Sequence, residues 1–335
     1  MGHGITGGGG MGAKDGAKDQ TGTTVENDGD RAANGGDRAA NGVCGAGAAK
    51  KATGGGLAVS IIGLGLIGGS FAYALRGFRN CTLTGYDIDA YTTAQALAKG
   101  AIDRAAVSLG DAARGADLVL FCTAPDAVQK NARACASELK DGAVVVEICG
   151  VKREISAALV SLLPERVDYI GVHPMAGKEV GGFVNAAPDL FHKAGFILIL
   201  PERRRKASLD LVEELCRHVG AGRVCHNSPE DHDRIIAYTS DLMHISATAL
   251  CAAFPADMTM AHTAGAFRDC TRIANIDAAL WTELLQKNAE YILPHLHSYI
   301  ESLSRVHETL KTGDADALHD FLSRACANKK EMTRL

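Results

Sequence analysis

The sequence predicts an α/β domain built on a parallel sheet, followed by an all-helical domain. Three observations lead to this prediction. Short β-branched runs alternate with helix-length segments from residue 57 to residue 227, as in consecutive βαβ units. A glycine-rich turn joins the first strand-like run to the first helical one. After Ser228-Pro229 the strand pattern ends, and long amphipathic stretches take its place.

The chain is predicted to have three segments, a tail at 1–56, the α/β domain at 57–227 and the helical domain at 228–335. The tail holds 18 of the 38 glycines and a tandem repeat, Gly29-Asp-Arg-Ala-Ala-Asn-Gly35 and then the same seven residues again. Its six basic and six acidic residues balance, and it has almost no large apolar side chains. Such a segment cannot bury enough surface to offset its ordering entropy, so we expect it to be disordered.

Hydrophobic patterning places the individual elements. Strands are expected at 58–62, 82–86, 117–122, 143–148, 167–172, 196–200 and 222–226. Helices are expected from Phe71 onward and at 90–99, 125–139, 152–163 and 207–219. In the second domain we expect helices at 230–253, with Ser228 as a candidate N-cap, and at 276–310 and 315–328. Long apolar helices in so small a domain often complete their burial by dimerising, so we expect a homodimer.

The glycine-rich turn predicts a Rossmann dinucleotide-binding domain. Gly63 permits the turn, Gly65 lets the backbone approach a pyrophosphate, and Gly68 lets the helix pack closely on the strand. The helix N-terminus then offers free N–H groups to the phosphates. Asp87 ends the second strand, where a carboxylate binds a ribose 2′-hydroxyl and repels a 2′-phosphate, so we expect NAD rather than NADP. The expected cofactor contacts are Gly63, Gly65, Leu66, Ile67, Gly68, Asp87, Cys122, Thr123 and Ala124.

Composition argues against several classes of function. The chain has 335 residues, 47% of them hydrophobic and 22% charged, as in a soluble globular protein, and its net charge of −4 argues against nucleic-acid binding. We see no apolar run that approaches the roughly 18 residues needed to span a bilayer, and no signal peptide. The ten cysteines are scattered without Cys-x-x-Cys pairs, so we expect reduced thiols in a cytoplasmic protein. His295 and His297 have no evident third ligand, so no metal site is expected.

Four polar side chains are candidates for chemistry. His173 follows a predicted strand, and ligands bind at the carboxyl ends of such strands, so it could act as a general base or be a structural histidine. On the helix at 230–253, His244 falls on a stripe of small polar residues that could wall a pocket or face solvent. Arg268 and Arg272 could each pair with a carboxylate, or form surface ion pairs.

Together these motifs resemble the prephenate/arogenate dehydrogenase family of tyrosine biosynthesis. The matching segments are Gly63-Leu-Gly-Leu-Ile-Gly-Gly-Ser70, Gly85-Tyr-Asp87, Gly150-Val-Lys152, His173-Pro-Met-Ala-Gly177, His232-Asp-Arg-Ile235, Leu242-Met-His244 and Phe267-Arg-Asp-Cys-Thr-Arg-Ile-Ala274. The resemblance covers about residues 57–300. It implies an oxidative decarboxylation, in which NAD⁺ takes a hydride from C4 of prephenate, CO₂ leaves, and the ring becomes aromatic.

The resemblance also implies roles for individual residues. His173 would deprotonate the ring 4-hydroxyl, and Arg272 would pair with a substrate carboxylate, supported by Trp281. His244 would line the substrate pocket as a third catalytic residue, and Arg268 would reach the site of the neighbouring subunit. Gly150 and Lys152 are further expected substrate contacts.

One departure from the family pattern concerns the surroundings of His173. The family often has a serine immediately before Val-Lys, where it bonds both the catalytic histidine and the substrate. Here that place is taken by Gly150, preceded by Cys149, so water, Cys149 or a backbone group must replace the hydroxyl.

Three other functions remain open on the sequence. The first is arogenate dehydrogenase, which differs only at the amine of the substrate side chain. The second is another two-domain Rossmann oxidoreductase, such as a β-hydroxyacid dehydrogenase, which would need a catalytic lysine in the helical half. The third, from a different class, is a non-catalytic NAD-binding sensor, which would be expected to have lost His173 or Arg272; both are present.

Overall fold

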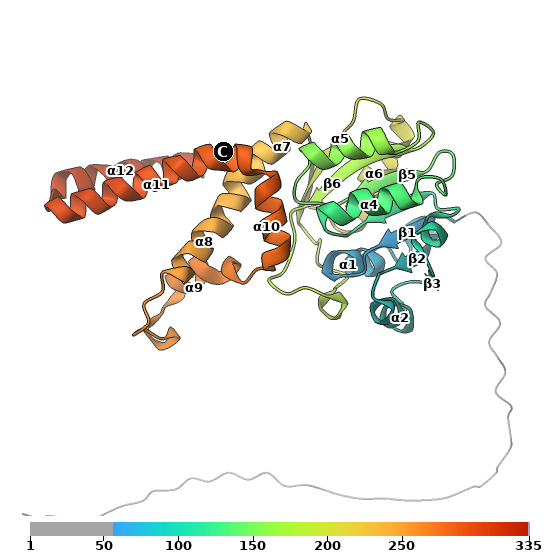
Figure 1. Ribbon diagram of the computed structural model, residues 1–335, viewed down its shortest axis with the longest axis horizontal. Coiled ribbons are helices and arrows are strands. Elements are labelled where there is room, and N and C mark those ends of the chain that lie inside the picture. The colour runs from blue at the N-terminus through green and yellow to red at the C-terminus, as the bar shows by residue number, and fades with distance from the viewer. Residues whose placement is uncertain (1–55, 334–335) are drawn as a thin grey trace, which may run out of the picture. The chain divides into compact units, whose positions relative to one another are not determined.

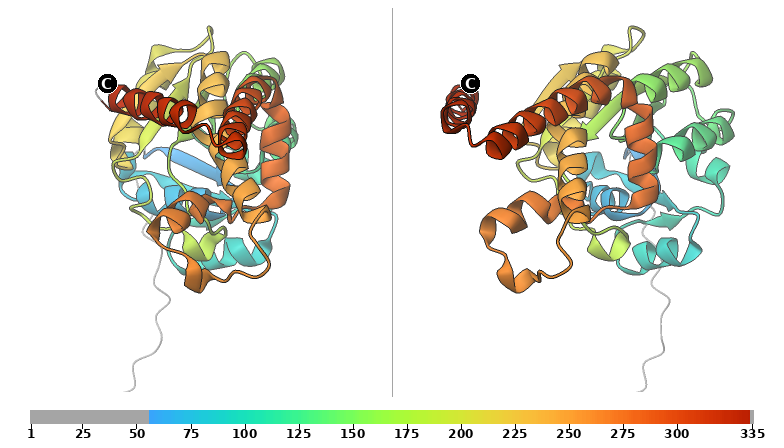
Figure 2. Two further views of the ribbon diagram at one scale, coloured as in Figure 1. Left: turned by 90° about the vertical axis from the view of Figure 1, so that its left-hand side faces the viewer. Right: turned by 60° about the vertical axis from the view of Figure 1, so that its left-hand side comes forward.

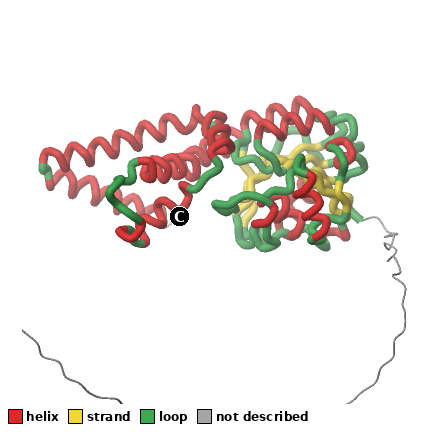
Figure 3. The backbone as a smooth tube through the Cα atoms, turned by 60° about the horizontal axis from the view of Figure 1, so that its bottom comes forward, coloured by secondary structure: helices red, strands yellow, loops and turns green. Residues whose placement is uncertain are grey.

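A computed structural model describes residues 56–333 of the chain, so the tail predicted at 1–56 lies outside the described residues except for Gly56. Eight strands form a single sheet with the order β3-β2-β1-β4-β5-β6-β7-β8. The strands are β1 (Ala58–Ile62), β2 (Thr82–Tyr86), β3 (Arg104–Ala105), β4 (Leu118–Phe121), β5 (Val144–Glu147), β6 (Asp168–Pro174), β7 (Gly195–Ile199) and β8 (Arg223–Asn227). Figure 3 shows the strands gathered in one half of the described chain, and helices and loops alone in the other.

Six helices cover the two faces of the sheet. They are α1 (Leu66–Ala74), α2 (Ala90–Ala98), α3 (Leu109–Ala113), α4 (Pro125–Cys135), α5 (Arg153–Leu162) and α6 (Lys206–His218). One apolar cluster packs Phe71 of α1, Ala96 of α2 and Leu215 of α6 against the sheet. A second cluster packs α3, α4 and α5 on the sheet, and Figure 1 shows α4 and α5 side by side. The two-faced α/β architecture is therefore confirmed.

The sheet differs from the prediction in one respect, because it is not wholly parallel. Strand β7 runs antiparallel to β6, with His173 opposite Ile197. The chain between these strands contains a 3-10 turn at Phe183–Asn185 in place of a crossover helix, and a parallel connection requires a crossover. All the other neighbouring strands pair in parallel.

The second half is helical, as predicted. Its helices are α7 (Pro229–Ile236), α8 (Leu242–Ala252), α9 (Gly265–Thr271), α10 (Ala278–Lys287), α11 (Ala289–Thr312) and α12 (Ala315–Met332), with a π-helical turn at Ala237–Asp241 joining α7 to α8. The single helix predicted at 276–310 is wrong, because the chain breaks at Asn288. This side chain is buried and donates to the Asp233 carbonyl and to Asp241 Oδ2, which fixes the break against α7 and α8.

One expectation about membranes needs correction. The helical stretch Pro229–Ala252 has the length and the apolar composition of a membrane-spanning helix. The same stretch contains the buried side chains of His232, Asp233 and Asp241, which are hydrogen-bonded within the fold. Through these hydrogen bonds, the helical stretch packs as part of the folded helical half.

The helical half leaves much apolar surface uncovered. Of the 24 residues of α11, Ile292 is the one that the described fold buries, whereas Leu293, Ile300, Leu303 and Leu310 are all more than half exposed. Helix α12 packs beside α11 and extends with it away from the sheet (Figures 1 and 2). A helix of this length with so little burial requires a further partner for its apolar face.

Candidate active site

Two adjoining cavities lie at the carboxyl ends of β1, β4, β5 and β6, beside α10. They measure about 530 Å³ and 360 Å³, and both are lined by His173 and Trp281. The strand order reverses between β1 and β4, and this is the point of an open α/β sheet where ligands bind. We identify the two cavities as the candidate active site.

The larger cavity contains the glycine turn. Gly63 has a φ of +92°, and a Cβ atom on Gly68 would lie 1.8 Å from the Gly63 carbonyl oxygen, so both glycines are required by the backbone itself. A Cβ on Gly65 would meet open space. Of the nine predicted cofactor contacts, six line this cavity: Gly65, Leu66, Ile67, Cys122, Thr123 and Ala124.

The turn fits the phosphates of a dinucleotide. The first backbone amides of α1 have no hydrogen-bond acceptor within the helix. The N-cap residue, Gly65, has no side chain to accept from them, and the first turn contains no acidic residue that would repel a phosphate. Asp87 lies at the end of β2, outside the cavity lining, and its carboxylate accepts hydrogen bonds from the backbone N–H groups of Leu64 (2.7 Å) and Asp89 (3.0 Å). Each of its oxygens keeps a further lone pair, which leaves the carboxylate able to accept from a ribose hydroxyl.

His173 is at one end of a three-residue series of hydrogen bonds. Its Nδ1 lies 2.8 Å from Nε2 of His232, and Nδ1 of His232 lies 2.7 Å from Oδ1 of Asp233. The Asp233 carboxylate also accepts from the backbone N–H groups of Lys152 and Arg153, each at 2.8 Å. The sequence analysis assigned no role to His232 or Asp233 beyond their place in a matching segment, because nothing in the spacing shows that they meet a residue about 60 positions earlier.

This series of hydrogen bonds determines which ring nitrogen of His173 carries the proton. Since Asp233 accepts from two amides, it acts as a carboxylate acceptor toward His232, whose Nδ1 therefore carries the proton. Nε2 of His232 is then an acceptor, and Nδ1–H of His173 donates to it. Nε2 of His173 is left with a free lone pair. Burial lowers the pKa of His173 well below its usual value, and His232 and Lys152 lower it further. Neutral His173 can therefore accept a proton at Nε2.

The smaller cavity brings together the other predicted substrate contacts. The His244 ring packs against Trp281, tilted by 30° at a centroid distance of 3.7 Å, and its Nδ1 lies 2.9 Å from the Ser240 carbonyl. Burial lowers the pKa of His244, and nearby Arg272 lowers it further. Arg272 also lines this cavity, with its side chain 65% exposed and its guanidinium paired with Glu179. A cationic group and an aromatic wall thus lie on the opposite side of the cavity from the sheet.

Gly150 leaves space beside the base. A Cβ atom at this position would lie 4.0 Å from Nε2 of His173 and 3.5 Å from the Leu284 side chain, both ordinary contact distances. The thiol of Cys149 lies 3.8 Å from the Thr123 carbonyl. The imidazole is therefore oriented from its Nδ1 side, through His232 and Asp233, while its Nε2 side faces the space left by Gly150.

Two predicted substrate contacts need separate comment. The side chain of Lys152 does not line either cavity: it is fully buried, and its ammonium donates to Glu147 Oε1 (2.6 Å) and to the Val172 carbonyl (2.9 Å). Arg268 is exposed on α9 and is not among the residues that line the two cavities of the candidate active site. Its predicted contact with a neighbouring subunit stays a prediction.

We expect the His173 imidazole to titrate well below the ordinary histidine pKa of about 6.5, because burial and two nearby groups disfavour its protonated form. The measurement is an NMR pH titration of the ligand-free protein, with the His173 signals assigned by their loss in His173→Asn. A titration midpoint at or above the ordinary value would contradict the described environment.

Comparison with known proteins identifies both domains. The nucleotide-binding domain of prephenate dehydrogenase matches residues 71–225, and the prephenate dehydrogenase dimerization domain matches residues 228–324. The chain is 31% identical over 267 residues to cyclohexadienyl dehydrogenase of Zymomonas mobilis, covering 78% of this chain and 90% of that protein. It is 28% identical over 276 residues to prephenate dehydrogenase of Bacillus subtilis, covering 80% and 74%.

Solved structures extend the likeness to three dimensions. Prephenate dehydrogenase from Aquifex aeolicus, in complex with hydroxyphenyl propionate and NAD⁺, superposes with a TM-score of 0.74 at 27% identity, over 84% of this chain and 99% of that one. The two matched domains follow each other along this chain, at residues 71–225 and 228–324. The chain belongs to the prephenate dehydrogenase family.

Proposed function

We propose that this protein catalyses the NAD-dependent oxidative decarboxylation of prephenate to 4-hydroxyphenylpyruvate, releasing CO₂ and NADH. The observation that carries the proposal is the free Nε2 of His173, which faces a cavity shared with the glycine turn on one side and with Trp281 on the other. In this proposal, a neutral base would lie between a dinucleotide site and a pocket with a cation, Arg272, at its rim.

The residues divide the chemistry between them. The bound nicotinamide would supply the hydride acceptor, held by Gly65, Leu66 and the loop at Cys122. His173 Nε2 would take the proton of the ring 4-hydroxyl as the hydride leaves C4, and the electrons of the bond to CO₂ would then complete the aromatic ring. His173 returns the proton to the product oxygen, so prephenate and NAD⁺ balance with 4-hydroxyphenylpyruvate, CO₂ and NADH.

Arg272 would release its exposed partner, Glu179, and bind a carboxylate of the substrate in its place. His244 and Trp281 would form the wall on which the ring rests. Because loss of CO₂ is driven by aromatisation, orientation and charge placement are the main contributions of these side chains.

We propose that two copies of the chain associate through the helical half. Its match to a dimerization domain supports this, and so does the exposed apolar row on α11 that includes Ile300 and Leu303. In such a dimer, exposed Arg268 on α9 would be available to the site of the partner subunit.

We expect the purified protein to form NADH from prephenate with a higher kcat/KM than from arogenate, in side-by-side assays at 340 nm. The two substrates differ at the side chain, where an amine replaces a ketone, so this comparison separates the two functions. A preference for arogenate would reassign the substrate within the family. No NADH from either compound, with NAD⁺ still bound, would favour the non-catalytic sensor.

We expect His173→Asn to lower kcat by about 10²- to 10⁴-fold, the usual contribution of general acid–base catalysis, while the KM for prephenate changes little. Asparagine keeps a polar group of similar size at the end of β6 but cannot accept the proton. Steady-state kinetics and a thermal melt measure both properties. A folded variant with the kcat of the wild type would dismiss His173 as the base.

We expect NAD⁺ to be preferred over NADP⁺ in kcat/KM, because the carboxylate of Asp87 would repel a 2′-phosphate. Asp87→Ser should narrow the difference by removing the charge. Asp89, whose side chain caps α2, is a matched control, and Asp89→Ser should leave the preference unchanged. Equal use of both cofactors by the wild type would contradict the role of Asp87.

A further inference from the structure

We propose that the buried ion pair of Glu147 and Lys152 positions the two backbone segments that carry Gly150 and His173, and so holds the base at its working geometry. This inference rests on the proposed role of His173. The pair lies outside the cavity lining, and it belongs to the supporting structure rather than to the groups that would touch substrate.

The pair is fully buried, and its polar atoms are well matched. Both side chains have 0% exposure, and their closest atoms are 2.6 Å apart. Burying two charges is unfavourable unless further hydrogen bonds compensate them. Glu147 accepts additional bonds from the Tyr169 hydroxyl and the Cys149 amide, and Lys152 donates to the Val172 carbonyl.

These additional bonds reach both segments of the catalytic site. Glu147 Oε2 accepts from the amide of Cys149 at 2.7 Å, which fixes the chain immediately before Gly150. Lys152 Nζ donates to the carbonyl of Val172 at 2.9 Å, which fixes the chain immediately before His173. The single ion pair therefore sets the distance between the end of β6 and the loop after β5.

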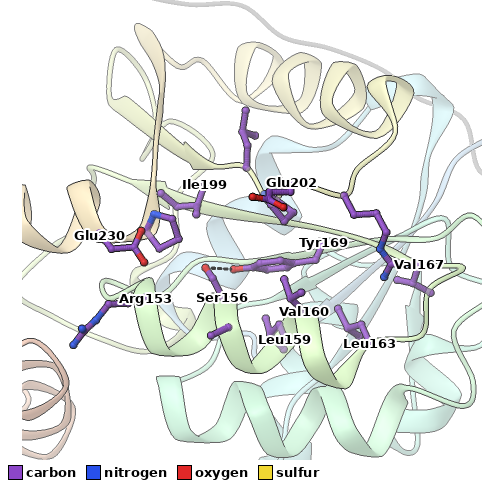
Figure 4. Close-up of a pocket in the computed structure, with 15 residues that line it drawn as sticks. Arg153, Ser156, Leu159, Val160, Leu163, Val167, Tyr169, Ile199, Glu202 and Glu230 are labelled. Atoms are coloured by element: carbon purple, nitrogen blue, oxygen red, sulfur yellow. Dashed lines mark hydrogen bonds between the residues drawn. The ribbon is translucent and has the colours of Figure 1, made fainter.

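Tyr169 connects the pair to a separate cavity beside α5. Its hydroxyl lies 2.9 Å from Glu147 Oε1 and 2.9 Å from Ser156 Oγ, the contact drawn as a dashed line in Figure 4. The ring forms part of the wall of this separate cavity, which measures about 440 Å³ and is lined mainly by apolar side chains such as Leu159 and Val160. Because Tyr169 itself is buried, its hydroxyl can be removed without opening the site to solvent.

Lys152 also acts on the charge of the base. Titratable or charged groups surround His173 from four elements. They are His232 and Asp233 on α7, Glu147 at the end of β5 with Lys152 in the loop that follows, His244 and Arg272 across the smaller cavity, and Lys178 and Glu179 on the loop after β6. Arg272 and Glu179 pair with each other at the exposed rim. Of the cations, Lys152 is the one that lowers the pKa of His173. Removing its charge should therefore raise that pKa.

The test is the double variant Glu147→Gln/Lys152→Met. Replacing both partners leaves no uncompensated charge, so it separates positioning from the instability expected of either single change. The glutamine can still bond the Cys149 amide and the Tyr169 hydroxyl, whereas the methionine leaves the Val172 carbonyl without its donor. We expect kcat/KM for prephenate to fall about 10- to 100-fold, as when a group that orients a catalytic ligand is lost. We also expect the acid limb of the pH profile to move to higher pH, with an unchanged Kd for NAD⁺.

Asp168→Asn is the matched control. Asp168 is a buried carboxylate at the opposite end of β6, where it accepts from Arg205 and Ser208. Its loss should lower the melting temperature but leave the pH profile in place. A purely structural role for Glu147 and Lys152 would make the double variant behave in the same way, and this result would overturn the proposal.

Two further measurements keep the proposal decisive. If the double variant does not fold, Tyr169→Phe removes one of the hydrogen bonds that hold Glu147. This variant should have a lower kcat and an unchanged Kd for NAD⁺. A kcat equal to that of the wild type would overturn the proposal.

If the wild type oxidises neither prephenate nor arogenate, the proposed function fails, and the NMR titration of His173 decides the positioning role. An unchanged midpoint in the folded double variant would then refute that role.

Discussion

The carboxylate of Asp233 is the junction on which the site depends. It accepts hydrogen bonds from the amides that begin α5 and from the ring of His232, so one side chain of α7 joins the helical half to the sheet. Both oxygens are used, and the group is buried. A carboxylate held by two amides remains an acceptor, and this property orients His232 and then His173. The joining of the two halves and the orientation of the base are therefore one interaction.

A second set of buried polar contacts surrounds this junction. Asn288 interrupts the helical pattern between α10 and α11 and donates to the carbonyl of Asp233. Glu147 and Lys152 connect the loop at Gly150 with the end of β6. Buried polar groups are costly when left unpaired, so such a network has few alternative arrangements. The region around His173 should consequently be more rigid than the exposed helices of the second half.

The absence of a side chain at Gly150 is consistent with this arrangement. A base that is oriented through its Nδ1 atom does not require a second hydrogen bond to keep its ring in place. The space beside Nε2 is bounded by Leu284 of α10, and so it belongs to the same cleft as Trp281. Arg272, by contrast, is exposed and paired with Glu179, so the substrate side of the cleft is held by contacts that can be exchanged.

The local pattern of the sequence was sufficient for the α/β half, for the glycine turn and for the helical character of the second half. Gly63 and Gly68 could be assigned because their requirement is local: a positive φ at one and a close backbone approach at the other. The antiparallel β7 and the break at Asn288 could not be predicted, because each depends on residues that are distant in the chain. The burial of Lys152 could not be predicted either: its partner Glu147 is close in sequence, but the packing of β6, which supplies the Val172 carbonyl, turns the ammonium inward.

The sequence by itself determined which residue types were available to the site: His173 at a strand end, Arg272 and Trp281 on the helices, and the turn at Gly65. Tertiary structure alone decided that His232 and Asp233 orient the base and that Lys152 faces Glu147 instead of the cleft. The physical reason is that hydrophobic period and turn chemistry act over a few residues, whereas a buried hydrogen bond is specified only when packing brings its two partners together.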